Sequence, residues 1–159
     1  MSGFWRCALY VAALGVVFFP IGRLAARHRF KWDRFPWKDY PFERQGALYR
    51  KIAIHKWQAH VPDMSRVFKK LMPAKRLYPG ISAAEVDEMV QETCVAEWTH
   101  IALSFAALPC FWLWPGWGGA LFYIVYTLLG NVTFILIQRF NRPKLAALAQ
   151  KLRRKEARS

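Results

Sequence analysis

Charged residues are missing from a long stretch of this sequence. Between Trp98 and Gln138 there is no Asp, Glu, Lys or Arg. One transmembrane helix needs roughly 20 apolar residues, so the stretch is long enough to cross a bilayer twice. The absence of charge therefore predicts two membrane-spanning segments.

Acidic residues are also scarce. The chain has 24 Lys and Arg but only 10 Asp and Glu, while 55% of its residues are hydrophobic and 16% are aromatic. The basic residues form blocks beside apolar segments, as in the cytoplasmic loops of membrane proteins. This pattern argues against a nucleic-acid-binding protein, in which the basic residues would gather on one exposed surface.

Cysteine and glycine motifs are lacking as well. Cys7, Cys94 and Cys110 have neither paired nor metal-binding spacing and fall in or near apolar segments, so we expect packing roles. There is no Gly-rich phosphate loop. His55 and His60 supply too few ligands for a metal, so we predict no metal and no bound cofactor.

The N-terminal apolar run, residues 7–22, has two interpretations. It has the length of a signal peptide. However, four basic residues follow it within ten positions, against one Arg before it, and only the weak motif at residues 24–26 resembles a cleavage site. We therefore expect a retained helix with its N-terminus outside.

These patterns predict an all-α, small polytopic membrane protein with one domain. Its expected parts are span one (4–21), a basic interfacial region (23–96), span two (97–114), a tight turn (115–119), span three (120–137) and a basic amphipathic tail (138–159). With the N-terminus outside, both basic regions lie on the cytoplasmic side, which agrees with the positive-inside rule.

The basic region combines cations with aromatic residues and prolines. Residues 23–80 hold fifteen Lys and Arg and four acids, and Pro36 and Pro41 argue against a long helix early in this region. The composition suits the headgroup layer, although a solvated loop is the alternative. We expect a helix over 47–59 and another that begins at a Ser82–Glu85 capping box and continues into span two.

A first polar group lies at the start of span two and contains Glu92, Glu97 and His100. Glu97 and His100 are three residues apart and so share a helix face. A histidine held by a carboxylate is the arrangement of a general base. The alternative is an interfacial ion pair that eases entry of the helix into the membrane.

A second polar group lies at the end of span three. Polar side chains at membrane depth normally face the protein interior, and arginine forks suit a phosphate or a carboxylate. Headgroup anchoring would explain the arginines but not the amides beside them. We expect Glu97, His100, Asn131, Arg139 and Asn141 to converge in one polar pocket. The members of this group are Asn131, Gln138, Arg139, Asn141 and Arg142.

These two groups carry a resemblance to a known family. Residues 92–100 and residues 131–145 are similar to motifs of the glycosyl-4,4'-diaponeurosporenoate acyltransferases, which act in carotenoid biosynthesis in bacteria. A weaker Lys-Trp element, Lys56 and Trp57 followed by Pro62 and Asp63, also resembles the family. In this element Gln58 stands where the family often has a basic residue.

The resemblance implies an acyltransferase of the bacterial cytoplasmic membrane. A fatty acyl group would pass from acyl-CoA or acyl-carrier protein to a hydroxyl of a membrane-embedded glycolipid, on the cytoplasmic side. His100 would deprotonate the hydroxyl, and Glu97 or Glu92 would orient the imidazole. The expected substrate-binding residues are Arg139, Arg142, Asn141, Gln138, Asn131, Lys56 and Trp57.

Two other functions remain open from the sequence. One is a non-enzymatic protein that binds anionic membrane lipids or assists assembly. The other is a different lipid-modifying enzyme, such as a methyltransferase or reductase, on a similar helical fold. The thioester donor, the glycolipid acceptor and the membrane lipids are the expected partners.

Overall fold

The computed structural model describes residues 1–44, 46–61 and 77–158, and all regular structure within them is helical. Three helices there are long and apolar enough to cross a membrane. They are α1 (Gly3–Leu24), α5 (Ala83–Ala106) with the short α6 (Cys110–Leu113), and a continuous rod of α7 (Trp117–Val125), η3 (Tyr126–Val132) and α8 (Thr133–Glu156). The predicted fold class is confirmed.

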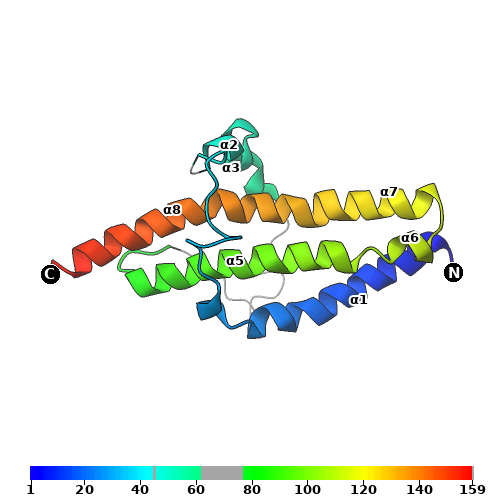
Figure 1. The fold of residues 1–159 in the computed structure, drawn as a ribbon, viewed down its shortest axis with the longest axis horizontal. Coiled ribbons are helices and arrows are strands. Elements are labelled where there is room, and N and C mark those ends of the chain that lie inside the picture. The colour runs from blue at the N-terminus through cyan, green and yellow to red at the C-terminus, as the bar shows by residue number, and fades with distance from the viewer. Residues whose placement is uncertain (45, 62–76, 159) are drawn as a thin grey trace.

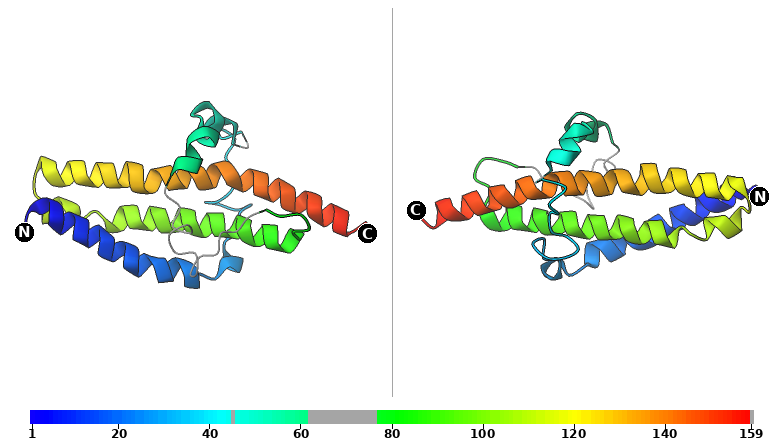
Figure 2. Two further views of the ribbon diagram at one scale, coloured as in Figure 1. Left: turned by 180° about the vertical axis from the view of Figure 1, so that it is seen from behind. Right: turned by 45° about the horizontal axis from the view of Figure 1, so that its top comes forward.

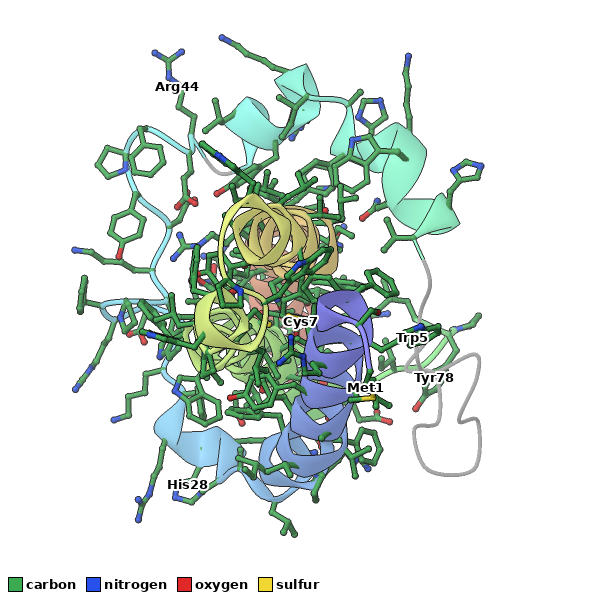
Figure 3. All side chains as sticks on the ribbon, turned by 90° about the vertical axis from the view of Figure 1, so that its right-hand side faces the viewer. Met1, Trp5, Cys7, His28, Arg44 and Tyr78 are labelled. Atoms are coloured by element: carbon green, nitrogen blue, oxygen red, sulfur yellow. The ribbon has the colours of Figure 1, made fainter. Side chains whose placement is uncertain are left out.

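The three long helices lie side by side along the long axis (Figure 1), and α1 packs against both α5 and α7. The N-terminus lies beside the turn from α6 to α7, and the C-terminus lies at the opposite end. Seen along the axis, Cys7 lies where α1 meets the other two helices (Figure 3). Its thiol is fully buried and contacts the Cys110 carbonyl oxygen at 3.6 Å.

The predicted start of the second long helix is confirmed. The Ser82 side chain accepts from the backbone N–H of Glu85, and the Glu85 carboxylate accepts from the backbone N–H of Ser82 at 2.9 Å. This capping box satisfies two donors at the helix N-terminus.

The prediction of one continuous helix over residues 47–59 is wrong. It breaks into α2 (Ala47–Lys51), α3 (Ile54–Trp57) and the 3₁₀ turn η2 (Gln58–His60). Ala53 takes a left-handed conformation with φ of 56°. This bend lets Tyr49 and Ile54 both pack against Phe140 of α8.

The C-terminal tail is also more integrated than the sequence indicated. Instead of a separate amphipathic helix it continues α8 without interruption through Pro143. Ala146 and Ala149 are buried there, and α8 packs against α5 more extensively than any other pair of helices. A further 3₁₀ turn, η1 (Arg27–Arg29), follows α1.

The turn between α6 and α7 depends on a close approach at Gly119. Its N–H donates to the Trp114 carbonyl oxygen at 3.0 Å. A Cβ atom at this position would overlap that oxygen and lie 2.5 Å from the Cys110 carbonyl oxygen. Gly119→Ala should therefore lower the free energy of unfolding by at least the ~1–3 kcal/mol typical of overpacking.

Thermal unfolding of the purified protein in detergent measures this effect. Gly15→Ala is the matched control, because a Cβ at Gly15 would meet no atom within 4 Å. Gly119→Ala with wild-type stability would contradict the close approach.

Candidate functional site

The candidate site lies along the seam between α5 and α8 (Figure 1). Buried residues recur every three or four positions on both helices, the spacing of a knobs-into-holes helix pair. On α5 they include Ala83, Val86, Val90, Thr93 and Glu97, and on α8 they include Arg142, Ala146 and Ala149.

Polar contacts cross this seam in antiparallel order and set its register. From the cytoplasmic end predicted by the sequence toward the other end, they are Ala83–Glu156, Asp87–Arg153, Thr93–Arg142, Glu97–Arg142, Glu97–Arg139 and His100–Asn131. A shift of either helix by one residue would break several of them together.

Glu97 is the centre of the seam. Its Oε1 accepts from Arg139 Nε at 2.8 Å, and its Oε2 accepts from Arg142 Nη2 at 2.5 Å. Arg139 and Arg142 are three residues apart and so project from one helix face. The sequence interpretation had Glu97 orient His100, but both carboxylate oxygens are bound to arginines instead.

Residues 30–44, which we call the strap, cross the α5–α8 pair (Figure 2, right). The Pro36 carbonyl oxygen accepts from Arg139 Nη2 at 2.9 Å, and the Trp37 carbonyl oxygen accepts from Arg142 Nη1 at 2.7 Å. Both oxygens of Glu43 accept from Arg139 Nη1, at 2.8 and 3.0 Å. The strap thus supplies the remaining hydrogen-bond acceptors of Arg139 and Arg142 from outside the seam.

Glu43 is 1% exposed and has further donors. The Tyr40 backbone N–H donates to it at 2.7 Å, and the Tyr49 hydroxyl also donates to it. Burial by itself would raise the pKa of Glu43, but these hydrogen bonds and Arg139 outweigh it and hold the pKa below its ordinary value. Burial and the bond to Glu43 raise the pKa of Tyr49. Glu43 is therefore ionised and Tyr49 neutral at physiological pH.

The charges of the network balance, because two carboxylates face two guanidinium groups. Arg139 and Arg142 each make four hydrogen bonds, and all three nitrogens of each guanidinium group take part. Their acceptors are all groups of the chain itself. In the structure both arginines therefore join segments of the chain to one another through hydrogen bonds, whereas the sequence suggested that they bind phosphate or sugar.

His100 faces an amide. Its Nδ1 lies 3.0 Å from Asn131 Oδ1. With the amide oxygen in this position, which only accepts, the hydrogen is assigned to Nδ1. In the neutral ring this leaves a lone pair on Nε2, where a base needs it. The ring also stacks on Phe134 with centroids 4.8 Å apart. Asn131, 1% exposed, orients His100 in place of a carboxylate.

Glu92 is placed apart from His100. It lies two helical turns earlier on α5, or about 12 Å along the axis. Its Oε1 is 3.2 Å from Arg27 Nε, an ion pair that holds η1 against α5. The structure therefore does not place Glu92 to orient the imidazole as the sequence had suggested.

The remaining predicted residues lie on α8 and on α3, away from Glu97. Asn141 Nδ2 donates to Gln58 Oε1 at 3.0 Å, so Asn141 does not join Glu97 in one pocket as expected. Trp57 packs on the core cluster around Phe140, and Lys56 is exposed. Gln138 is half-buried. Pro62 and Asp63 lie outside the described residues.

A small open hollow lies over the arginines, with a volume of about 30 Å³. It has room for about two or three waters but not for a lipid, since a water needs roughly 10–15 Å³ measured in this way. Within the described residues, no three His, Cys, Asp or Glu side chains are placed to hold a metal. The hollow is lined by Trp32, Trp37, Asp39, Glu43, Arg139, Arg142 and Pro143.

Sequence reasoning missed Glu43, Tyr49 and Thr93. Glu43 carried a signal, since it is one of only four acids among fifteen basic residues in positions 23–80. Thr93 lies one turn before Glu97 on the same face of α5. The strap carbonyls carried no signal, because every residue has one.

Comparison with known proteins connects this arrangement to one family. A sequence model described as glycosyl-4,4'-diaponeurosporenoate acyltransferase matches residues 27–151. Proteins of that name from Staphylococcus aureus are similar over nearly the whole chain. The one from strain Newman is 26% identical and the one from strain MRSA252 is 25% identical, each over 151 residues, or 94% of this chain and 89% of the relative. No solved structure matches the chain.

The charge network predicts the effect of neutralising Glu43. Glu43→Gln keeps the side-chain shape but leaves Arg139 with less buried counter-charge. Removing one partner of a buried ion pair costs about 3–5 kcal/mol, so the unfolding free energy in detergent at neutral pH should fall by that order. The control Asp87→Asn breaks an exposed pair with Arg153 and should cost at most about 1 kcal/mol.

The same pair of variants differs in acid. The lowered pKa of Glu43 means that its stabilisation is complete at neutral pH and is lost as the pH falls through about 4 and below. Glu43→Gln should therefore lose less stability than the wild type on acidification. Equal losses for Glu43→Gln and Asp87→Asn at neutral pH would contradict the network.

Proposed function

We propose that this chain, which belongs to the glycosyl-4,4'-diaponeurosporenoate acyltransferase family, moves a fatty acyl group from a thioester donor to a sugar hydroxyl of a membrane-embedded glycolipid. Family membership makes it an acyltransferase. The name of its relatives specifies a glycosylated diaponeurosporenoate as acceptor. A glycosylated carotenoid is accordingly the acceptor class that we propose here.

The His100–Asn131 pair is the observation that carries the mechanism. Asn131 holds the Nδ1–H form of the ring, so Nε2 is free to remove a proton from the acceptor hydroxyl. General bases of this kind typically contribute 10²–10⁴ to the rate. An amide partner keeps the pair uncharged in the resting state, which suits an apolar environment where an isolated charge is costly.

Transfer is proposed to be direct, without an acyl-enzyme intermediate. Cys94 is the nearest thiol in the seam, but it is fully buried and its Sγ contacts the Val90 carbonyl oxygen of its own helix at 3.7 Å. Acyl-CoA or acyl-carrier protein is the proposed donor. The Glu43–Arg139–Glu97–Arg142 network supports the site by fixing α5, α8 and the strap against one another.

The proposed setting is the bacterial cytoplasmic membrane. The outer faces of α1 and of the α7–η3 region expose large apolar residues, including Val16, Val17, Leu121 and Leu129, and such faces suit lipid. The strap, η1 and the end of α8 carry the basic residues, so they belong on the cytoplasmic side by the positive-inside rule.

His100→Ala should lower turnover by roughly 10²–10⁴ while leaving folding and membrane insertion intact, since the imidazole makes one side-chain hydrogen bond and one ring contact. Lipid mass spectrometry of the acylated product, with purified enzyme, an acyl thioester and a glycolipid, measures the rate. Lys151→Ala and Arg154→Ala are controls at exposed positions. Each removes only about 1 kcal/mol of attraction to the anionic membrane surface, so turnover should change little. Full activity in His100→Ala with loss in the tail variants would reject His100 as the base.

The proposed orientation predicts a labelling pattern. Trp117 is 91% exposed at the turn that starts α7, and Arg158 is exposed at the other end. A cysteine at Trp117 should react with an impermeant maleimide in intact cells, and a cysteine at Arg158 only after permeabilisation. The native cysteines are buried. Labelling of the Arg158 position in intact cells would reverse the orientation.

A further inference from the structure

Two buried hydrogen-bond donors on η3, the helix that carries the partner of His100, have no acceptor among the described residues. They are Asn131 Nδ2 and Thr127 Oγ1. The Tyr126 hydroxyl also lies near the Asn131 amide, but it makes no hydrogen bond of acceptable geometry with Nδ2. An unsatisfied buried donor costs about 1–3 kcal/mol, so two of them in one turn need an explanation.

The two donors belong to one short segment of backbone. Residues 126–132 form a π-helix, η3, between α7 and α8. Thr127 and Asn131 are four residues apart, which keeps them on one face in either helix type, and η3 packs against α5. Single π-helical turns inside α-helices occur frequently at functional sites.

The chemistry of the two groups defines the missing partner. Asn131 Nδ2 can only donate, and its Oδ1 is already bound to His100. The partner of Nδ2 is therefore an acceptor, and a carbonyl oxygen, which can take two hydrogen bonds, would satisfy both donors at once. A phosphate or carboxylate is disfavoured, because the chain has no Lys or Arg between Trp98 and Gln138 to balance its charge.

We propose that Asn131 Nδ2 and Thr127 Oγ1 bind the carbonyl oxygen of the acyl donor and stabilise the negative charge it gains in the reaction. This inference rests on the proposed acyl transfer and adds to it the group that polarises the thioester. The role proposed for the Thr127 hydroxyl is separate from the role of His100 as the general base.

The reaction balances with these groups. His100 Nε2 takes the proton of the acceptor hydroxyl as its oxygen bonds to the thioester carbon, and the carbonyl electron pair moves onto the oxygen held by Thr127 and Asn131. When the carbonyl re-forms, the C–S bond breaks and the sulfur leaves with the proton that His100 returns. Preorganised donors aimed at such an oxygen act most strongly where water is excluded.

Thr127→Val separates this role from a structural one, because it removes the hydroxyl at nearly constant volume. Turnover should fall, with loss of one oxyanion donor costing about 10²–10³, while the melting temperature stays equal or rises, since an unsatisfied buried hydroxyl is removed. Thr127→Ser should recover much of the activity. Thr99→Val is the matched control, because the Thr99 hydroxyl already bonds to the Val95 carbonyl oxygen at 2.9 Å.

Infrared spectroscopy tests the contact without turnover. An acyl-pantetheine whose thioester is replaced by a ¹³C-labelled amide keeps the carbonyl but cannot transfer its acyl group. Its carbonyl stretch should shift to lower frequency on binding to the wild type and shift less on binding to Thr127→Val.

The outcomes separate the two proposals. Full activity in Thr127→Val, an unchanged carbonyl shift, or a lowered melting temperature would overturn the carbonyl site and leave acyl transfer standing. If the wild type neither binds the amide analogue nor transfers from any thioester, the proposed donor and the carbonyl site both fail.

Discussion

One buried cluster of four charges determines how this chain is put together. Glu43, Glu97, Arg139 and Arg142 come from three separate segments, yet the side chains of Glu43, Glu97 and Arg142 are at most 4% exposed and that of Arg139 is 15% exposed. Taking such groups out of water is costly unless each finds opposite charge and hydrogen bonds. That requirement is met only when α5, α8 and the strap hold one relative position, so the cluster specifies the arrangement of the site around it.

The sequence predicted the helices well because their signals are local. Uncharged length indicated the long apolar helices, and Ser82 with Glu85 indicated where α5 begins. The same reasoning selected Glu97, His100, Asn131 and Arg139 as members of one region. Helix periodicity shows which face a residue occupies, but it does not show which side chain of another helix it will meet. The sequence therefore could not predict that Glu97 pairs with arginines and that His100 pairs with the amide of Asn131.

Other features depended on tertiary contacts. Ala53 bends the predicted 47–59 helix because Tyr49 and Ile54 share Phe140 as a packing partner, and nothing in the local sequence requires that bend. The π-helix η3 likewise has no composition signal, although it carries Asn131, the partner of His100. The strap lacks periodicity altogether, and its contribution comes largely through backbone carbonyls and one carboxylate.

The strap also has a consequence for the order of assembly. Glu43 is 96 residues away from Arg139 in the chain, whereas Glu97 of α5 is only 42 residues away from it. Contacts between near neighbours form with little loss of chain entropy, while distant ones form late. The α5–α8 hairpin can therefore associate before Glu43 reaches it, with one more guanidinium charge than carboxylate between the helices. Docking of the strap removes that excess, so burial of the arginines is complete only when nearly the whole chain is in place.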